Sequence, residues 1–260
     1  MTKALFLDID GTLVSFKTHR IPQSTIEAIR MARNKGIKVF TSTGRPRQLL
    51  GSVPDMEGLF DGYVLANGAH CIIGDTTVRK QLIPRDEAER LLDYCNTHQR
   101  PVFVVGMDDI QYANPNETMR HVIFELLKVT YNKFDLPMEQ VLGQGIVQMT
   151  PFISANEEQH IMPEMPHSTS TRWHPTFCDV MAAGADKATG LAAVAEALGI
   201  SVAETMAFGD GGNDISMLRA AGTGVAMGNA LDCVRQHADY VTTSVDDDGV
   251  YNALRHFGII

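Results

Sequence analysis

Two aspartates stand directly after a short apolar run near the start of the chain. Asp8 and Asp10 are the acids of the segment DIDGT at residues 8–12. Residues i and i+2 of an extended segment project to the same side, so both carboxylates are expected at the carboxyl end of a strand, where open α/β sheets bind ligands. Adjacent carboxylates repel unless they share a cation or a proton. Mg²⁺ prefers such oxygen ligands, although the pair alone is equally typical of a strand that ends in a polar turn.

A second acidic motif follows another apolar run late in the chain. The segment GDGGND at residues 209–214 places Asp210 and Asp214 near Asn213. Its three glycines allow the backbone to approach a ligand closely. A flexible turn would explain these glycines, but it would not explain two acids at the end of a buried strand.

Two further segments carry groups that suit a phosphate. Residues 41–45, TSTGR, follow a predicted strand and offer the Thr43 hydroxyl, the backbone N–H of Gly44 and the guanidinium of Arg45. Lys187 begins a predicted helix. Taken alone, the first segment is more typical of a plain strand-to-helix turn, and a lysine at a helix start is usually solvated.

The charges of these segments favour one shared site. The acids Asp8, Asp10, Asp210 and Asp214 would bring about −4, and a phosphate dianion about −2 more. Such a site assembles only with cations. The cations that the sequence and its chemistry suggest are Mg²⁺, Lys187 and Arg45.

The elements that must position these groups alternate between apolar strands and helices. We expect strands at residues 3–8, 37–42, 62–66, 204–209, 223–227 and 239–242, and helices at 22–35, after Pro46, and at 187–198, 213–221 and 230–237. Continuous apolar strands separated by helices indicate a parallel sheet covered on both faces. The predicted fold is therefore α/β, with a doubly wound, mainly parallel, Rossmann-like sheet.

The middle of the chain has a different pattern. Helices are expected at residues 84–99, 116–130 and 155–162, and strands at 101–105, 110–113, 146–152, 168–173 and 177–182. This α+β pattern predicts an inserted cap domain at 82–183. The catalytic core would then be discontinuous, built from residues 1–81 and 184–260.

Composition narrows the classes of function. The chain has 260 residues and a formal net charge of −9, which argues against a nucleic-acid partner. Four cysteines without a C-x-x-C pair indicate reduced thiols. The sequence predicts no signal peptide and no run of about 20 apolar residues that could span a membrane. We expect a cytoplasmic enzyme without a membrane partner, and a monomer.

In this order, the motifs resemble those of the haloacid dehalogenase superfamily. Its four motifs are similar to Asp8–Thr12, Thr43, Lys187 and Asp210–Asp214. The segments STGR, Asn67-Gly68-Ala69, GDGGND and Asp248-Gly249-Val250 resemble the Cof-type branch, which carries a large C2-type cap between the second and third motifs. The chain looks especially like the sugar-phosphate phosphatases of that branch.

The resemblance implies a role for each matching residue. It makes Asp8 the nucleophile that becomes an aspartyl phosphate and Asp10 the general acid and base. Thr43 and Lys187 would hold the phosphoryl group, together with Gly44, Arg45 and Asn213. The implied cofactor, Mg²⁺, would be held by Asp8, by the Asp10 backbone carbonyl and by Asp210, with Asp214 supporting it directly or through water.

Some alternatives stay open. In the superfamily that the chain resembles, dehalogenases and phosphonate hydrolases lack an acid at the position of Asp10, so this residue argues against both activities. A phosphomutase, which returns the phosphoryl group to a sugar, remains compatible with the motifs. A non-enzymatic phosphoaspartate switch and a catalytically silent binding protein fit the length and the filled motifs less well. The partner is expected to be a small phosphorylated metabolite: a hexose, pentose, flavin, nucleotide or pyridoxal phosphate. Candidate specificity residues in the cap, for which simple packing is at least as good an explanation, are Gln148, Thr150, Trp173, His174 and Asp179.

Overall fold

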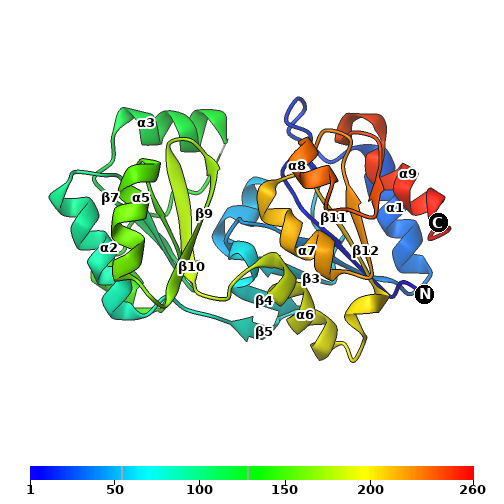
Figure 1. Cartoon of the computed structure of the whole chain (residues 1–260), viewed down its shortest axis with the longest axis horizontal. Helices are drawn as coiled ribbons and strands as arrows, with labels where there is room; N and C mark the ends of the chain where they lie inside the picture. Colours follow the sequence, from blue (N-terminus) through cyan, green and yellow to red (C-terminus); the bar gives the residue numbers. More distant parts are fainter. Residues whose placement is uncertain (54, 128) are drawn as a thin grey trace. The chain divides into compact units, whose positions relative to one another are not determined.

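The computed structural model of the chain describes residues 1–53, 55–127 and 129–260 and, at Trp173, the backbone only. The described residues form two compact units (Figure 1). The first comprises Met1–Gly44, Val53–Arg79 and Asp186–Ile260, and the second comprises Arg45–Ser52 and Lys80–Ala185.

The first unit is built on a sheet of eight strands in the order β13-β12-β11-β1-β2-β3-β4-β5. The pairs from β13 to β3 are parallel, and β4 runs antiparallel to β3. This mainly parallel arrangement confirms the predicted fold class. The strands are β1 (Ala4–Leu7), β2 (Lys38–Ser42), β3 (Gly62–Leu65), β4 (His70–Ile73), β5 (Thr76–Lys80), β11 (Thr205–Gly209), β12 (Thr223–Ala226) and β13 (Tyr240–Val241).

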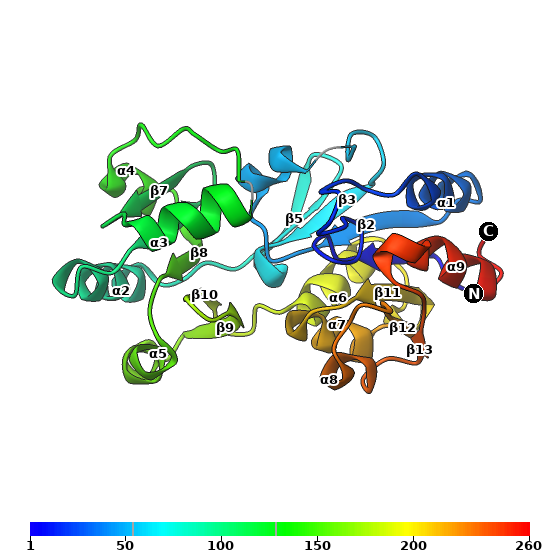
Figure 2. The ribbon, with the colours of Figure 1, turned by 90° about the horizontal axis from the view of Figure 1, so that it is seen from above.

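Helices cover both faces of this sheet. They are α1 (Gln23–Asn34), α6 (Lys187–Ala197), α7 (Ile215–Ala220), α8 (Asp232–Arg235) and α9 (Gly249–His256), with short 3₁₀ turns at Ala66–Gly68, Val202–Glu204, Gly212–Asp214 and Val245–Asp247. Phe6 and Phe40 project from one face and pack with Leu191 of α6 and Met217 of α7. The helices α6, α7 and α8 lie on that side, and α1 lies on the other (Figure 2).

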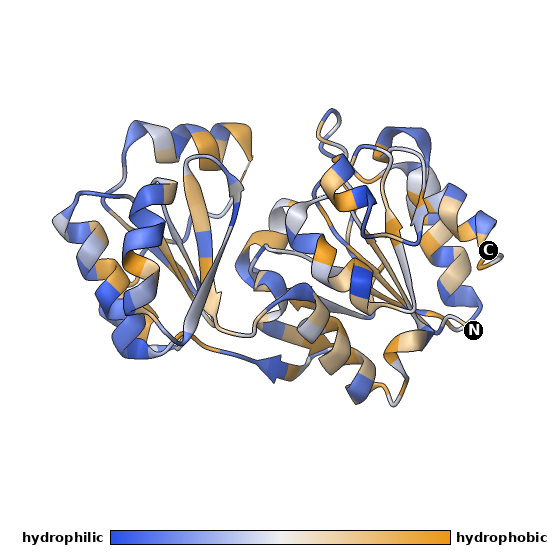
Figure 3. Ribbon diagram, in the orientation of Figure 1, coloured by the Kyte–Doolittle hydropathy of each residue, from blue (hydrophilic) through white to orange (hydrophobic). Residues whose placement is uncertain are grey.

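The second unit has an antiparallel sheet of five strands in the order β7-β6-β8-β10-β9. The strands are β6 (Val102–Gly106), β7 (Ile110–Ala113), β8 (Ile146–Pro151), β9 (Ser168–His174) and β10 (Phe177–Ala182). The helices are α2 (Arg85–Thr97), α3 (Glu117–Arg120), α4 (Met138–Gly143) and α5 (Ala155–Ile161), with a π-helical turn at His121–Leu126 and 3₁₀ turns at Arg47–Ser52 and Met162–Glu164. Hydrophobic residues concentrate along the inner strands of each sheet, whereas the edge strands β5 and β9 are more hydrophilic (Figure 3).

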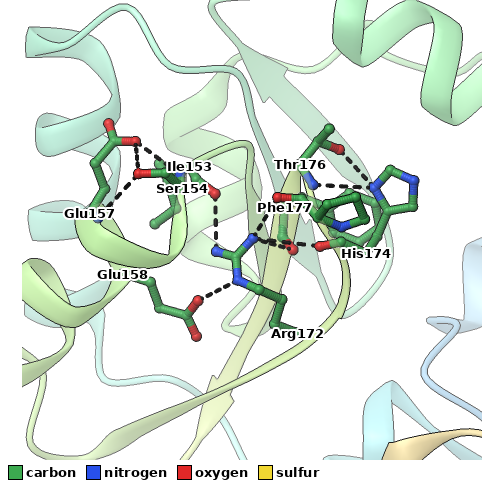
Figure 4. Close-up of polar contacts among 9 residues, drawn as sticks. Ile153, Ser154, Glu157, Glu158, Arg172, His174, Thr176 and Phe177 are labelled. Atoms are coloured by element: carbon green, nitrogen blue, oxygen red, sulfur yellow. Dashed lines mark hydrogen bonds and ion pairs between the residues drawn. The ribbon is translucent and has the colours of Figure 1, made fainter.

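The turn between β9 and β10 is held by one arginine (Figure 4). Arg172 donates from Nη1 to the carbonyl oxygens of Pro175 and Phe177, at 3.2 and 3.1 Å, and from Nη2 to that of Ile153, at 3.0 Å. Its Nε also donates to Oε2 of Glu158 at 2.7 Å. The arginine therefore fixes the hairpin to the start of α5.

Some elements differ from the sequence prediction. The strands β4 and β5 and the helices α4 and α9 were not expected from the sequence, and the helix expected at 116–130 is α-helical only at Glu117–Arg120. The segment Arg45–Ser52 lies inside the range predicted as core, yet it belongs to the second unit. There Gln48 Nε2 donates to the carbonyl of Gly106 at 2.9 Å.

Two other observations bear on the expected environment. No helix in the described ranges has both the length and the apolar character of a membrane span. Cys71, Cys95 and Cys178 are buried, Cys233 is exposed, and all are free thiols.

Candidate active site

The register of the central strands brings the first and fourth motifs together. Leu7 of β1 pairs with Phe208 of β11, and the backbone N–H of Asp8 donates to the carbonyl of Phe208 at 3.0 Å. Asp8 therefore leaves β1 beside Gly209, one residue before Asp210 leaves β11. The turn after Asp8 needs a glycine: Gly11 has φ of 91°, and a Cβ there would lie 2.2 Å from Oδ2 of Asp210.

The third motif supplies a buried cation between two acids. Lys187 is the first residue of α6, and the side chain of Asp186 caps the helix by accepting from the N–H of Thr189. The ammonium of Lys187 is fully buried. It donates to Oδ1 of Asp8 at 2.6 Å and to Oδ1 of Asp214 at 2.5 Å.

The loop of the fourth motif folds back on its own backbone. Oδ2 of Asp214 accepts from the N–H groups of Asp210 and Gly211, at 2.9 and 2.8 Å. Gly209 makes this possible, because a Cβ at that position would lie 2.4 Å from Cβ of Asp214. Asp214 is thus held by two backbone donors and one ammonium.

The acids of this cluster carry more negative charge than their neighbours balance. Burial raises the pKa of Asp8 well above its usual range; the ammonium of Lys187 opposes this, and the charges of Asp214 and Asp210 raise it further. Burial likewise raises the pKa of Asp210 to about 7. Burial alone would lower the pKa of Lys187, but the charges of Asp214 and Asp8 raise it above its usual value. Lys187 therefore stays charged and cannot satisfy the acids alone.

This donor set fits a divalent cation. Asp8, Asp210 and Asp214 each present a carboxylate oxygen, and these oxygens lie within 4.8 Å of one another. An oxygen-only set of this kind suits a hard cation such as Mg²⁺. A bound cation would also relieve the repulsion that raises the pKa of Asp8 and Asp210.

The second motif reaches the same edge of the sheet through backbone contacts. Thr43 is buried. Its N–H donates to the carbonyl of Val64, and its carbonyl accepts from the N–H of Asn67. A Cβ on Gly44 would lie 3.3 Å from the side-chain amide of Asn67, whose Oδ1 accepts from Nδ2 of Asn213 at 3.0 Å. Thr43, Gly44 and Asn213 are thus linked through Asn67.

Two predicted site residues lie outside the carboxylate cluster. Asp10 is partly exposed, pairs with Val14 in a short β-bridge and is not among the three clustered carboxylates of the described residues. Arg45 belongs to the second unit, where its Nη1 donates to Oγ of Ser52 at 2.9 Å.

Two residues that orient Asp210 were given no role by the sequence. Thr12 Oγ1 donates to Oδ1 of Asp210 at 2.9 Å. Asn229 Nδ2 donates to Oδ2 of Asp210 at 3.2 Å and to the carbonyl of Gly11 at 2.8 Å. Asn229 comes three residues after the end of β12, whereas Asp210 follows β11 directly, so a polar residue in the loop after a strand was the usable signal.

The second unit gathers three of its candidate residues into a buried polar cluster. Thr150 Oγ1 and Gln148 Nε2 donate to Oδ1 of Asp179, at 2.8 and 2.9 Å. His174 instead lies at the start of the β9–β10 turn, where its Nδ1 contacts Oγ1 of Thr176 at 2.8 Å and its ring stacks on Phe177. The side chain of Trp173 lies outside the described residues.

Comparison with known proteins identifies the family of the chain. The pattern of the haloacid dehalogenase-like hydrolases matches residues 5–254. The solved structure of the subclass IIB sugar phosphatase BT4131 is 44% identical over the full length of both chains, with a TM-score of 0.92. The structure of BT1666 from Bacteroides thetaiotaomicron, described among the phosphatases of the same superfamily, is 37% identical over 100% of this chain and 96% of that one, with a TM-score of 0.89.

A curated relative of known name agrees with these structures. The 5-amino-6-(5-phospho-D-ribitylamino)uracil phosphatase YcsE of Bacillus subtilis is 32% identical over 98% of this chain and 95% of that protein. Both the sequence and the fold therefore point to the same group, and the expected resemblance is confirmed. The chain belongs to the haloacid dehalogenase-like hydrolases, in the branch whose named relatives are phosphatases.

Proposed function

We propose that the chain is a Mg²⁺-dependent phosphatase that hydrolyses small phosphate monoesters through an aspartyl phosphate on Asp8. The observation that carries the proposal is the ammonium of Lys187 set between Asp8 and Asp214. It orients one carboxylate oxygen of Asp8 and leaves the other for attack. In this proposal the first unit is the catalytic core, and the second is the inserted cap that selects the non-phosphate part of the substrate.

The first step transfers the phosphoryl group to the protein. The free carboxylate oxygen of Asp8 attacks phosphorus, and an O–P bond forms while the bond from phosphorus to the ester oxygen breaks. Asp10, protonated at this stage, donates its proton to the leaving alcohol. Thr43 and Lys187 hold the oxygens of the transferring group, and Asn213 assists from the opposite loop. Catalysis then depends on positioning and charge stabilisation more than on covalent chemistry.

The second step returns the enzyme to its starting state. Asp10, now a carboxylate, removes a proton from a water molecule that attacks phosphorus. The O–P bond to Asp8 breaks, and inorganic phosphate leaves. Asp10 lies two residues from Asp8 and is partly exposed, so it can exchange protons with both the alcohol and the water.

The proposed Mg²⁺ site uses the side chains of Asp8 and Asp210 and the backbone carbonyl of Asp10, with Asp214 in support. When bound, the cation would neutralise charge on the phosphoryl oxygens. Thr12 and Asn229 fix the carboxylate of Asp210 for this purpose by donating to its two oxygens.

The proposed substrates are sugar phosphates. BT4131, at 44% identity, is a sugar phosphatase, and the substrate of YcsE also carries its phosphate on a polyol chain. Gln148, Thr150 and Asp179, which bond to one another in the buried polar cluster, are the residues proposed to read the sugar hydroxyls. The same proposal places the enzyme in the cytoplasm, because four free cysteines persist in a reducing compartment. It also treats the enzyme as a monomer.

A panel of phosphate esters tests the proposal. Purified protein with Mg²⁺ is assayed for inorganic phosphate on hexose, pentose, flavin, nucleotide and pyridoxal phosphates, with Asp8→Asn as the matched blank. We expect release to be fastest on sugar phosphates and to fall by at least about 10⁴-fold in Asp8→Asn, because the nucleophile is lost. Turnover by Asp8→Asn at the wild-type rate, or an isomerised sugar phosphate without phosphate release, would refute it.

A further inference from the structure

The turn that follows β3 has an unusual backbone. Ala66 and Asn67 are consecutive non-glycine residues with φ of 47° and 50°, and Gly68 follows with φ of 90°. Left-handed backbone costs a non-glycine residue roughly 1 kcal/mol or more. Ala66 has no polar side chain that could offset this cost. Its surroundings must therefore impose the conformation, and such strained residues cluster at functional sites.

The backbone of this turn touches two of the segments assigned to the active site. The N–H of Asn67 donates to the carbonyl of Thr43 at 3.0 Å. Gly68 packs directly on the residue before Lys187, because a Cβ on Gly68 would lie 2.0 Å from the carbonyl oxygen of Asp186. The turn thus sets the spacing between the loop of Thr43 and the start of α6.

The side chain of Asn67 reaches a third segment. Asn67 is buried, and its Oδ1 accepts from Nδ2 of Asn213 at 3.0 Å. Its amide also lies against Gly44, where an added Cβ would be 3.3 Å away. One buried amide therefore connects the loops that follow β2 and β11 at the carboxyl edge of the sheet.

We propose that Asn67 is a positioning residue for the phosphoryl group, acting through Asn213. The strained turn fixes the relative positions of three segments, which are the loop of Thr43, the start of α6 and the loop that follows β11. The hydrogen bond to Asn213 fixes the amide that the proposed mechanism directs at the phosphate. This inference rests on the proposed function. The competing explanation is that asparagine is present only because it tolerates left-handed backbone.

Glycine substitution separates the two explanations. Asn67→Gly keeps a residue that adopts positive φ freely and removes only the amide. The matched control is Asn114→Gly: Asn114 has φ of 52°, and its amide donates to the carbonyls of Cys95 and Arg100 in the second unit. We expect Asn67→Gly to lower kcat/KM for p-nitrophenyl phosphate by about 10- to 100-fold and Asn114→Gly to leave it unchanged.

A double-mutant cycle tests the route through Asn213. If Asn67 acts through that residue, Asn67→Gly combined with Asn213→Ala loses no more activity than Asn213→Ala alone. Independent losses that multiply, or wild-type activity in Asn67→Gly, would overturn the proposal. So would an activity loss fully matched by a fall in the midpoint of thermal unfolding.

A binding measurement keeps this inference separate from the proposed function. Orthovanadate affinity, measured by calorimetry, requires the phosphoryl site but no turnover. We expect Asn67→Gly to weaken it by about 10-fold, and Asn114→Gly to leave it unchanged. A wild-type protein that binds vanadate but releases no phosphate would refute the phosphatase proposal alone. Equal vanadate affinity in the wild type and Asn67→Gly would refute the positioning role alone.

Discussion

Both units bury carboxylates, and they place them in opposite electrostatic environments. In the first unit, burial raises the pKa of Asp8 and Asp210, and the charge of Asp214 adds to the effect in both. Glu87 of the second unit is also buried. Burial would raise its pKa too, but hydrogen bonds from Ser168 and His167 hold the pKa of Glu87 below its usual value.

The difference lies in the donors that surround each charge. Oε1 of Glu87 accepts from the backbone N–H and from Nδ1 of His167, each at 2.9 Å, and Oε2 accepts from the Ser168 hydroxyl at 2.5 Å. These bonds join α2 to the start of β9 and leave the charge satisfied. The first unit offers one ammonium to a group of acids. A buried acid with a raised pKa indicates a functional site, here one that suits an additional cation. A buried acid whose charge is satisfied by hydrogen bonds, such as Glu87, indicates a structural role.

Removal of divalent cations should give the largest difference between the acid cluster of the first unit and the Glu87 site of the second. Excess EDTA is expected to lower phosphate release by about 10³-fold or more, because several kcal/mol of charge stabilisation is lost. Adding Mg²⁺ back should restore the rate and raise the midpoint of thermal unfolding. Glu87→Gln should show the same Mg²⁺ dependence as the wild type, and Asp210→Asn a much weaker one. Full activity in excess chelator would contradict the assigned metal role.

Lys187→Met tests how far the first unit depends on Lys187, the one buried lysine or arginine among the residues that the structure describes. Removing one partner of a buried ion pair typically costs about 3–5 kcal/mol, and here Asp8 and Asp214 both lose their ammonium. In EDTA we therefore expect the free energy of unfolding of Lys187→Met to fall by about 3–5 kcal/mol, and in Mg²⁺ by less. Lys38→Met is the control, because Lys38 pairs with Asp61 at the surface, where such pairs contribute up to about 1 kcal/mol. Equal effects of the two variants would show that the buried acids need no cation.

The same comparison shows what could be predicted from the sequence. Asp8 and Asp210 were found because each follows an apolar strand, and parallel strands end at one edge. Asn229, in the loop after β12, was missed because its role depends on contacts with Gly11 and Asp210, which are 218 and 19 residues away in the chain. Local patterns identify strand ends, but they do not say which side chains meet across them.

Polar contacts of the second unit escaped prediction for a related reason. Gln148 and Thr150 were named as candidate specificity residues, and they lie two residues apart on β8, so they project from the same face of the strand. Their joint partner, Asp179, depends on the antiparallel register that pairs Val180 with Met149, and a shift of one residue would turn Asp179 to the other face. The Glu87 site was missed altogether, because an acid on a predicted helix is normally exposed.

Glu87→Gln gives the smallest expected effect and tests the satisfied environment directly. The amide NH₂ group of the glutamine would face the groups of His167 or Ser168 that donate to Glu87, and one of those donors would lose its acceptor. We therefore expect the free energy of unfolding at neutral pH to fall by about 2 kcal/mol. Phosphate release should be unchanged. Trp173 is the single tryptophan of the chain and belongs to the second unit, so its fluorescence during urea unfolding reports on the unit that contains Glu87.

The pH dependence of this variant decides whether the charge of Glu87 is what stabilises the hairpin. Because the pKa of Glu87 is lowered on folding from its usual value of about 4.5, its stabilising effect is present above that value and is lost as the pH falls through the folded-state pKa. The wild type should therefore lose stability more steeply than Glu87→Gln between about pH 5 and pH 3, and the two curves should converge. Glu139→Gln, at an exposed helix position, should run parallel to the wild type. If the Glu87→Gln curve also ran parallel to it, the hydrogen bonds rather than the ionisation of Glu87 would account for the stabilisation.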